Sequence, residues 1–213
     1  MSQILLTEQS SAPSAPAAGK QKLFSRDFAD PLIQSIDDAG KVQTLGGLIV
    51  NQNTADVTAN AANTYLTGSS ISLGKTGLRV GTRFRWTMVM TKTAAGTAQP
   101  IFTVVYGTNG STSDTARLTY TLVAQTAATD TGRCDIDVIV RTHSSSGVLQ
   151  GTLSFGHNGT TAGLANQAQE QIQQSASSAF DTTVANSIIG VCCNPGASGV
   201  WTFQLVMAEA YNL

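Results

Sequence analysis

Charged residues are scarce in this chain of 213 residues. Asp, Glu, Lys and Arg together make up 12% of it, against about 25% in a typical soluble domain. Disorder does not explain the shortage, because hydrophobic residues reach 41% and the formal net charge is only −1, the opposite of the balance in disordered chains. The chain also lacks the basic excess that attracts proteins to nucleic acid. The composition therefore predicts a folded chain with a polar, nearly uncharged surface and no nucleic-acid partner.

Long apolar runs and a disulfide framework are missing too. No run of about 18 apolar residues is present, so we expect no membrane insertion. The first residues, MSQILLTEQSS, lack the positive start and the apolar core of a secretory signal. The three cysteines, Cys134, Cys192 and Cys193, are odd in number and two are adjacent. This pattern favours small buried side chains in a protein made in a reducing cytoplasm.

Recognisable catalytic and metal-binding motifs are also absent. The chain has no G-x-S-x-G and no H-E-x-x-H, and its cysteines fit no metal pattern. His143 and His157 allow a facing pair across a hairpin, but no third ligand stands at a recognisable spacing. Residues 74–76, Gly-Lys-Thr, resemble the end of a phosphate-binding loop, but Ser69 stands where that loop needs glycine. We predict no enzyme activity, no cofactor and no metal site.

What the chain does contain is strict alternation of apolar and polar residues, the signature of half-buried strands. Such runs cover 83–90, 115–124, 134–143 and 200–210, and clusters of Gly, Ser, Thr and Asn separate them. The residues expected to point inward are Phe84, Trp86, Met88, Met90, Leu118, Tyr120, Leu122, Cys134, Ile136, Val138, Val140, Trp201, Phe203, Leu205 and Met207. Strands at this spacing predict an all-β fold, a jelly-roll-like antiparallel β-sandwich over 65–213.

One segment of this range, 164–180, does not alternate. Its residues tolerate a helix, but the apolar anchors are only Leu164, Ile172 and Phe180. The segment is compatible with a short helix, a polar edge strand or a long loop.

The first 64 residues are predicted to form an attachment region. Residues 1–22 read as an extended anchoring arm, in which an apolar tip precedes the Ser/Ala/Pro spacer SSAPSAPAA. Residues 23–50 predict a small β-hairpin adaptor from the runs KLFSRD and LIQSID, followed by turn residues at 37–41. Because two strands alone are marginal in water, this hairpin needs a further partner. Residues 51–64 are predicted to be a linker to the sandwich.

Charged residues gather at two places in the predicted sandwich. Asp135 and Asp137 share one strand face, and Arg83 and Arg85 share the outer face of another strand, so cross-strand ion pairs are expected. Paired carboxylates also suit acid–base chemistry at a glycosidic bond or a bound cation. The locally basic stretch, which is compatible with a glycan or nucleic-acid role, comprises Lys75, Arg79, Arg83, Arg85 and Lys92.

The segment TEQSSAPSAPAAGKQKLFSRDFADPLIQSIDDAGKVQTLGG resembles one common in virion proteins of tailed bacteriophages. There a Pro-rich lead precedes AGKxxLYxKD and a short LYxxDDAGxexxL hairpin. The matching residues are Pro13, Pro16, Ala18, Gly19, Lys20, Leu23, Phe24, Asp27, Asp37, Asp38, Ala39, Gly40 and Leu45. Phe24, Ser25 and the middle FADPLIQS depart from the pattern. The remainder, from GLRVGTRFRW to the end, resembles a C-terminal β-sandwich module of phage structural proteins.

This resemblance implies a trimeric jelly-roll module on the virion surface, attached by its N-terminal adaptor and assembled in the bacterial host cytoplasm. The chain would be a capsid decoration or head-fibre subunit. Its partners would be its own copies in a homotrimer, and the major capsid protein or another virion protein. The candidate particle-docking residues are Ile4, Leu5, Leu6, Leu23, Phe24, Leu32 and Ile33.

Two other functions are compatible with the same sequence. One is a tail-fibre or receptor-binding subunit that recognises host surface glycan through loops 107–114 and 194–199, with Tyr106 and Trp201 at their edges. The other is a depolymerase that uses Asp135 or Asp137. Such enzymes resemble much longer repetitive β-helices, and no repeat is present in this chain.

Overall fold

The computed structural model describes residues 51–73, 77–93, 95–158, 163–164 and 170–211. It also describes residues 14, 15 and 17 and the strands at 8–9, 22–26, 32–36, 42–44 and 49–50. These residues form strands, turns and irregular segments without any helix, so none of them forms a helix that would span a membrane. The all-β prediction is therefore confirmed.

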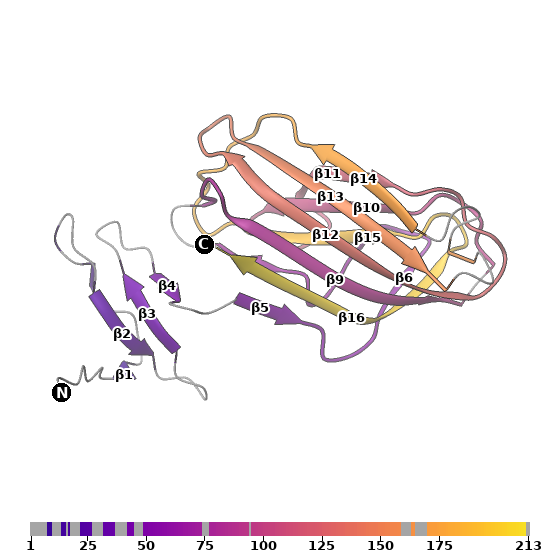
Figure 1. The fold of residues 1–213 in the computed structure, drawn as a ribbon, viewed down its shortest axis with the longest axis horizontal. Helices are drawn as coiled ribbons and strands as arrows, with labels where there is room; N and C mark the ends of the chain where they lie inside the picture. The colour runs from indigo at the N-terminus through magenta and orange to yellow at the C-terminus, as the bar shows by residue number, and fades with distance from the viewer. Residues whose placement is uncertain are drawn as a thin grey trace.

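Two antiparallel sheets pack face to face (Figure 1). The larger has the order β14–β13–β12–β9–β16–β5, and β6 also pairs with β16. The smaller has the order β11–β10–β15–β7, and β8 also pairs with β15. The strands of the larger sheet are β5 (Ile49–Gln52), β6 (Val57–Asn60), β9 (Arg83–Lys92), β12 (Asp130–Thr142), β13 (Val148–His157), β14 (Glu170–Ala176) and β16 (Val200–Tyr211). Those of the smaller sheet are β7 (Thr64–Tyr65), β8 (Ile71–Ser72), β10 (Ile101–Gly107), β11 (Thr115–Thr121) and β15 (Ile188–Asn194).

The strand pairing is nested. β9 pairs with β16 in one sheet, and the strands that lie between them in sequence, β10 and β15, pair in the other sheet. From β9 onward the chain crosses between the sheets four times, from β9 to β10, from β11 to β12, from β14 to β15 and from β15 to β16. This wrapping places the first strands of the sandwich, β5 and β6, next to its last strand, β16. It also encloses one hydrophobic core.

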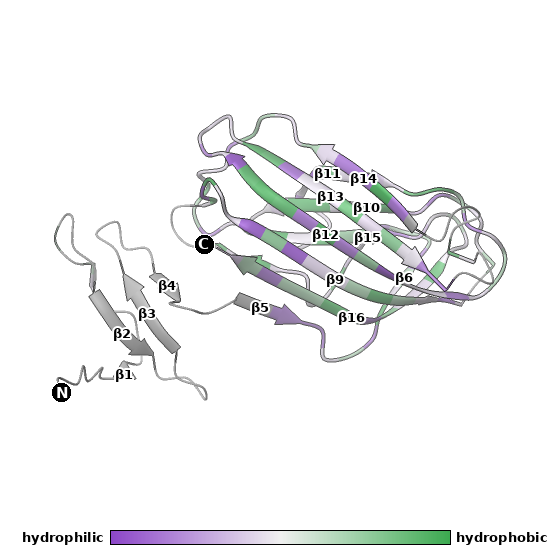
Figure 2. Ribbon diagram, in the orientation of Figure 1, coloured by the Kyte–Doolittle hydropathy of each residue, from purple (hydrophilic) through white to green (hydrophobic). Residues whose placement is uncertain are grey.

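Aromatic side chains fill that core. Phe84, Trp86, Met88 and Met90 on β9 are completely buried, as their alternation predicts. Figure 2 shows hydrophobic and hydrophilic residues alternating along β9. Phe102 of the smaller sheet lies 5.9 Å from Trp201 of the larger, measured between ring centroids. Each such buried side chain contributes roughly 1.5–3 kcal/mol relative to solvent exposure, so the aromatic contacts between the sheets hold the sandwich together.

The predicted alternation fails in the second half of β16. Trp201 and Phe203 are buried as expected, but Leu205 and Met207 are half-exposed, and the buried residues are instead Val206, Ala208 and Ala210. A β-bulge between Phe203 and Leu205 shifts the register against β9. One extra residue moves every following side chain to the opposite face, so the prediction that Leu205 and Met207 point inward was wrong.

The side chain of Asn53 compensates the backbone at this bulge. The Val206 amide donates to Asn53 Oδ1 at 2.6 Å, and Asn53 Nδ2 donates to the Gln204 carbonyl at 3.3 Å. Asn53 lies between β5 and β6, which pair with successive parts of β16. A β-bulge leaves backbone N–H and C=O groups of the strand without partners in the neighbouring strand. The side-chain amide of Asn53 supplies those partners.

Within the segment 164–180, residues 170–176 form an edge strand, β14, which pairs with β13. Leu164 and Phe180 are buried as predicted, but Ile172 is 68% exposed and is not an anchor. Two glutamines connect β14 to the last residue of β11 and to the chain just after it, in the other sheet. Gln173 Nε2 donates to the Thr121 carbonyl at 2.5 Å, and the Val123 amide donates to Gln171 Oε1 at 3.1 Å. These bonds join the two sheets along this side, next to an edge strand that would otherwise be open to pairing.

The N-terminal strands form a sheet of their own. β1 (Glu8–Gln9), β2 (Lys22–Arg26), β3 (Leu32–Ile36) and β4 (Val42–Thr44) pair in that order, β1 and β2 in parallel. β2 and β3 correspond to the two strands of the predicted hairpin. The turn predicted at 37–41 lies outside the described residues.

The segment 51–64, predicted to be a linker, belongs largely to the sandwich. The end of β5 and the whole of β6 pair with β16, and Thr64 pairs with Cys193 of β15. The linker assignment was wrong because these strands are short and their sequences, such as VTAN, carry no apolar alternation. They form by pairing with neighbouring strands. The other predicted domain boundaries stay predictions.

Candidate functional site

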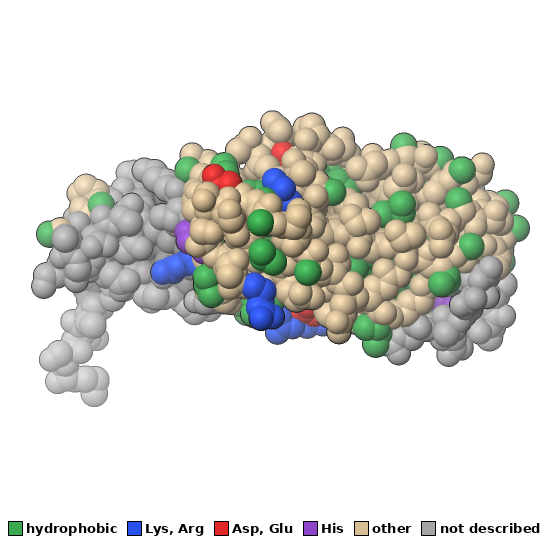
Figure 3. Space-filling model, turned by 90° about the horizontal axis from the view of Figure 1, so that it is seen from above, with side chains coloured by type: hydrophobic (Ala, Val, Ile, Leu, Met, Phe, Trp, Pro, Cys, Tyr) green, Lys and Arg blue, Asp and Glu red, His purple; other side chains and the backbone are tan. Residues whose placement is uncertain are grey.

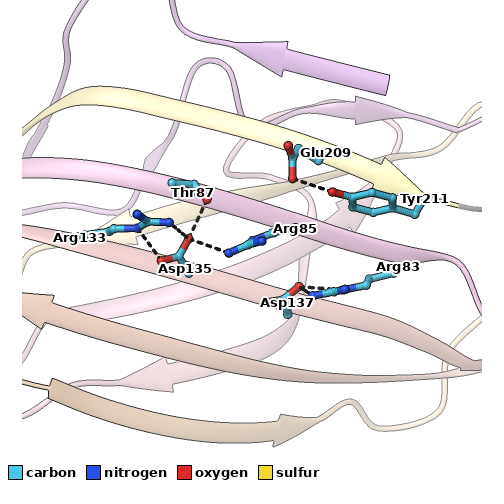
Figure 4. Close-up of polar contacts among 8 residues, drawn as sticks. All are labelled: Arg83, Arg85, Thr87, Arg133, Asp135, Asp137, Glu209 and Tyr211. Atoms are coloured by element: carbon cyan, nitrogen blue, oxygen red, sulfur yellow. Dashed lines mark hydrogen bonds and ion pairs between the residues drawn. The ribbon is translucent and has the colours of Figure 1, made fainter. Parts of the chain in front are cut away.

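The outer face of the larger sheet carries the main charged cluster (Figure 4). Arg83 and Arg85 come from β9, Asp135 and Asp137 from β12, and Glu209 from β16, because each strand points these alternate residues away from the core. Asp137 is the register partner of Arg85, and Glu209 pairs with Arg85 from the other side. The strand register therefore brings opposite charges together across three strands.

The expected cross-strand ion pairs are present. Arg83 Nε donates to Asp137 Oδ1 at 2.9 Å, and Arg85 Nη2 lies 3.6 Å from Asp135 Oδ1. Asp135 also accepts a hydrogen bond from Arg133 Nε at 2.7 Å and one from Thr87 Oγ1 at 2.7 Å. Sequence reasoning missed Arg133, although it stands two residues before Asp135 on the same face of the strand.

The pKa of Asp135 lies below its ordinary value. Partial burial acts to raise it, but the hydrogen bonds from Arg133 and Thr87 and the charges of Arg133 and Arg85 together outweigh burial. A catalytic general acid needs a raised pKa near the working pH. The carboxylate of Asp135 is therefore held in its ionised form by its neighbours, which suits an ion-pair network better than a hydrolase acid.

A shallow groove of about 230 Å³ adjoins this cluster on the same face. It is lined by Arg83, Asp137, Val138, Ile139, Gln150, Gly151 and Thr152. Tyr211, the register partner of Arg83 on β16, lies beside it with 42% of its surface exposed. The Arg83 guanidinium lies 5.9 Å from the centre of the Tyr211 ring. The groove thus combines polar groups with exposed apolar surface.

A second charged cluster is buried at the other end of the same strands. Lys92 is completely buried, and its Nζ donates to the carbonyls of Thr126 and Ala128 at 2.7 and 3.0 Å. Asp130, the register partner of Lys92, lies 3.0 Å from His157 Nδ1, and both side chains are at most 3% exposed. Burial lowers the pKa of Lys92, and the charge of Asp130 opposes part of that shift. This cluster closes the end of the core.

The described residues of the basic stretch do not gather into one patch. Lys92 points into the core, Arg83 and Arg85 are paired with carboxylates, and Arg79 is exposed before β9. Lys75 and the rest of 74–76 lie outside the described residues. The alternation would have revealed the burial of Lys92, because it continues the inward series that begins at Phe84.

The two histidines do not face each other. His157 ends β13, beside the first residues of β12, whereas His143 follows the last residue of β12. They stand at opposite ends of the hairpin because each strand is at least ten residues long. In the described part of the chain, no three His, Cys, Asp or Glu side chains gather as metal ligands would.

The loops predicted to bind glycan lie at opposite ends of the smaller sheet. Loop 107–114 follows β10, whose last residue Gly107 pairs with Ile188, while loop 194–199 follows the other end of β15, where Asn194 pairs with Ile101. Tyr106 and Trp201 are buried and cannot stack on a ligand. These two loops therefore do not form one site, and that prediction was wrong.

The predicted docking residues fall partly on described strands. Leu23 and Phe24 lie on β2, and Leu32 and Ile33 lie on β3, where Ile33 pairs with Ser25. Ile4, Leu5 and Leu6 lie outside the described residues. Their docking role stays a prediction.

The cysteines are free and buried, as predicted. Burial raises the pKa of Cys134 and Cys193 well above the ordinary value, and that of Cys192 to about 11. Thiols with raised pKa values are poor nucleophiles and metal ligands, so these three act as small core side chains.

No protein-family model and no curated protein matches this chain. Among solved structures, it is similar to the structure of infectious bursal disease virus, Gx strain, with a TM-score of 0.25 and 13% identity over 88% of this chain and 49% of that one. It is also similar to a mutant VP2 protein of infectious bursal disease virus in derived T=1 particles, with a TM-score of 0.19 and 11% identity over 83% of this chain and 46% of that one. The chain spans about half the length of these proteins. At such TM-scores the likeness carries no argument, and function is inferred from the chain's own residues.

Proposed function

We propose that this chain is a non-enzymatic structural protein of a tailed-bacteriophage virion, a capsid decoration or head-fibre subunit attached through its N-terminal arm. The observation that carries the proposal is the adaptor segment. Its sequence resembles the Pro-rich lead and DDAG hairpin of phage virion proteins, and among the described residues its strands β1–β4 pair only with one another. The small N-terminal sheet is suited to attachment. The sandwich, which has its own core, is suited to display.

The sandwich supports a display role. Figure 3 shows that the described surface in that view is mostly uncharged and polar, with few Lys, Arg, Asp or Glu side chains. On the outer face of the larger sheet, Arg83, Arg85 and Arg133 are paired with Asp135 and Asp137. Interactions between exposed charges weaken as salt rises, so a surface with few of them tolerates changes in ionic strength.

The location is tested by electron microscopy. Gold-labelled antibody raised against residues 65–213 is applied to intact phage particles that contain the chain. Gold spread over the head is expected for a decoration or head-fibre subunit. Gold confined to the tail would replace this proposal with the tail-fibre alternative, and virions without gold would overturn both.

The attachment route is tested by deletion. Phage that produce the chain without residues 1–50 are expected to assemble heads that lack it, because the docking residues are gone. A full-length chain with Thr119→Val, an exposed change on β11 of the sandwich, serves as the control that still decorates. Heads decorated by the shortened chain would contradict attachment through the arm.

The homotrimer is part of the same proposal. Light scattering on the purified chain is expected to give three times the mass of one 22.1 kDa chain. A monomer at micromolar concentration would remove the trimer from the proposal without affecting the attachment test.

A second candidate, a receptor-binding subunit for host surface glycan, is favoured by one observation. The groove beside Arg83 and Tyr211 presents polar and apolar groups together on an open sheet face, whereas the loops first expected to bind glycan lie apart.

A further inference from the structure

We propose that the groove on the outer face of the larger sheet binds an uncharged carbohydrate. This inference deepens the second candidate function, but it does not depend on where the chain is attached to a particle. The position of the groove follows from strand register. Tyr211, Arg83, Ile139 and Gln150 lie in one row across β16, β9, β12 and β13, each the register partner of the next. Asp137 and Thr152 are partners in the following row.

The groove holds hydrogen-bonding groups that the fold leaves uncommitted. Both Arg83 bonds to Asp137 end on Oδ1, so Oδ2 meets no donor among the described residues. Within the same part of the chain, the Gln150 amide and the Thr152 hydroxyl make no hydrogen bond, although both side chains are half-buried. A carboxylate oxygen, an amide and a hydroxyl offer both acceptors and donors, which is what the vicinal hydroxyls of a sugar ring require.

Apolar surface lies directly beside these groups. Ile139 is 40% exposed and Tyr211 is 42% exposed, two of the few large apolar side chains exposed on the described surface. The Tyr211 hydroxyl donates to Glu209 at 3.0 Å, and its ring lies near the Arg83 guanidinium. A sugar ring has C–H faces as well as hydroxyls. An amphipathic aromatic ring next to hydrogen-bonding groups matches both.

The ion pair within the groove favours an uncharged ligand. Arg83, Arg85 and Arg133 on this face pair with Asp135 and Asp137, Glu209 accepts from Tyr211, and the exposed Arg141 on β12 does not line the groove. Because Arg83, Arg85 and Arg133 are already engaged by carboxylates, an anionic ligand that binds these arginines would have to displace Asp135 or Asp137. A cation would meet the Arg side chains. Hydrogen bonding and apolar contact remain as the means of recognition.

The test is saturation-transfer NMR on the full-length chain. The probes are glucose, galactose, mannose and N-acetylglucosamine at millimolar concentration, with glucuronate as a charged comparator. At least one neutral sugar is expected to receive saturation and to compete with the others, and glucuronate is expected to receive less. Absence of transfer to all four neutral sugars, or stronger transfer to glucuronate, would overturn the inference.

Matched variants place the binding in the groove. Thr152→Val keeps the side-chain shape and removes only a hydroxyl that makes no internal bond, and Gln150→Ala removes the neighbouring amide. Each substitution is expected to weaken the binding of the neutral sugar about ten-fold, because at least one hydrogen bond to the sugar is lost. Thr119→Val, the same change on the outer face of the other sheet, is expected to leave binding unchanged.

The variants also separate failure of this site from failure of the fold. All three must show the wild-type melting temperature, since none removes a described contact. Equal binding by wild type and Thr152→Val, or equal loss in Thr119→Val, would overturn the assignment to the groove. Neither result changes the gold-labelling test of particle attachment.

Discussion

The two charged clusters of the larger sheet lie on the same strands, β9 and β12, but at opposite ends and on opposite faces. Arg83, Arg85 and Asp135 meet on the solvent side, where the Arg83 and Asp137 side chains are 52% and 32% exposed. Lys92 and Asp130 lie on the core side, and the Asp130 side chain is only 3% exposed. The residue types are similar, and the surroundings differ.

The difference determines how each cluster contributes to stability. Exposed ion pairs are screened by water and contribute roughly 0–1 kcal/mol. A buried group instead loses its hydration, and removal of one partner leaves the other unpaired, at a cost of about 3–5 kcal/mol. The buried cluster is therefore expected to be critical for folding, and the outer cluster is free to serve recognition.

The largest effect is expected from Asp130→Ala. The carboxylate accepts from the Thr131 amide at 2.8 Å and from the Leu164 amide at 3.2 Å and lies against His157. Its loss should lower the free energy of unfolding by about 3 kcal/mol or more, measured by urea denaturation. A loss below about 1 kcal/mol would erase the contrast between the two clusters.

Lys92→Met should have the next largest effect. Methionine keeps the apolar stem but cannot donate to the Thr126 and Ala128 carbonyls. The removal of a buried charge offsets part of this loss, so we expect a destabilisation of about 1–2 kcal/mol in the same urea experiment. Lys92→Arg, which keeps the charge but is too large for the site, is the control. An arginine variant as stable as wild type would show that the site is open to water.

Asp135→Asn tests the outer cluster through pH. The folded-state pKa of Asp135 is lowered, so its contribution is present above the unfolded value of about 3.9 and is lost as pH falls through the folded value. The variant should lose a small amount of stability at pH 7 and almost none at pH 2. Urea midpoints at both pH values measure this, with Asp56→Asn on the exposed loop between β5 and β6 as the control. A variant that loses more stability at pH 2 than at pH 7 would contradict the ionised assignment.

The smallest effect is expected from Asp137→Asn. Its partner Arg83 is more than half exposed, so screening should limit the loss to well under 1 kcal/mol. Thermal melts at about 0.05 and 0.5 M salt should differ less for the variant than for wild type. A loss comparable to that of Asp130→Ala would mean that the outer face is buried in the assembled protein.

The outer cluster was predicted from the sequence, and the buried one was not. Period two placed Arg83, Arg85, Asp135 and Asp137 on outward faces, and antiparallel pairing brought them together. The same period places Lys92 inward. A charged residue was not expected there, because its burial depends on carbonyls of the loop at 126–128, which are more than thirty residues away in sequence.

Other elements lay beyond sequence reasoning for related reasons. The bulge in β16 has no composition signal, since Gln204 is an ordinary strand residue, and it is visible only from its register with β9. The groove depends on β13 lying next to β12, which places Gln150 and Thr152 beside Ile139 and Asp137. Side chains brought together by pairing between distant strands are not encoded in any local pattern.

The amide of Asn53 at the bulge links two positions that are far apart in the chain. Without the extra residue in β16, Glu209 and Tyr211 would point into the core and Ala208 and Ala210 would face water. A chain lacking that residue would also have no unpaired backbone for Asn53 to satisfy. Position 53 and the length of β16 are therefore expected to change together during evolution. An insertion or deletion in the last strand is expected to be accompanied by a substitution about 150 residues earlier in the sequence, at position 53.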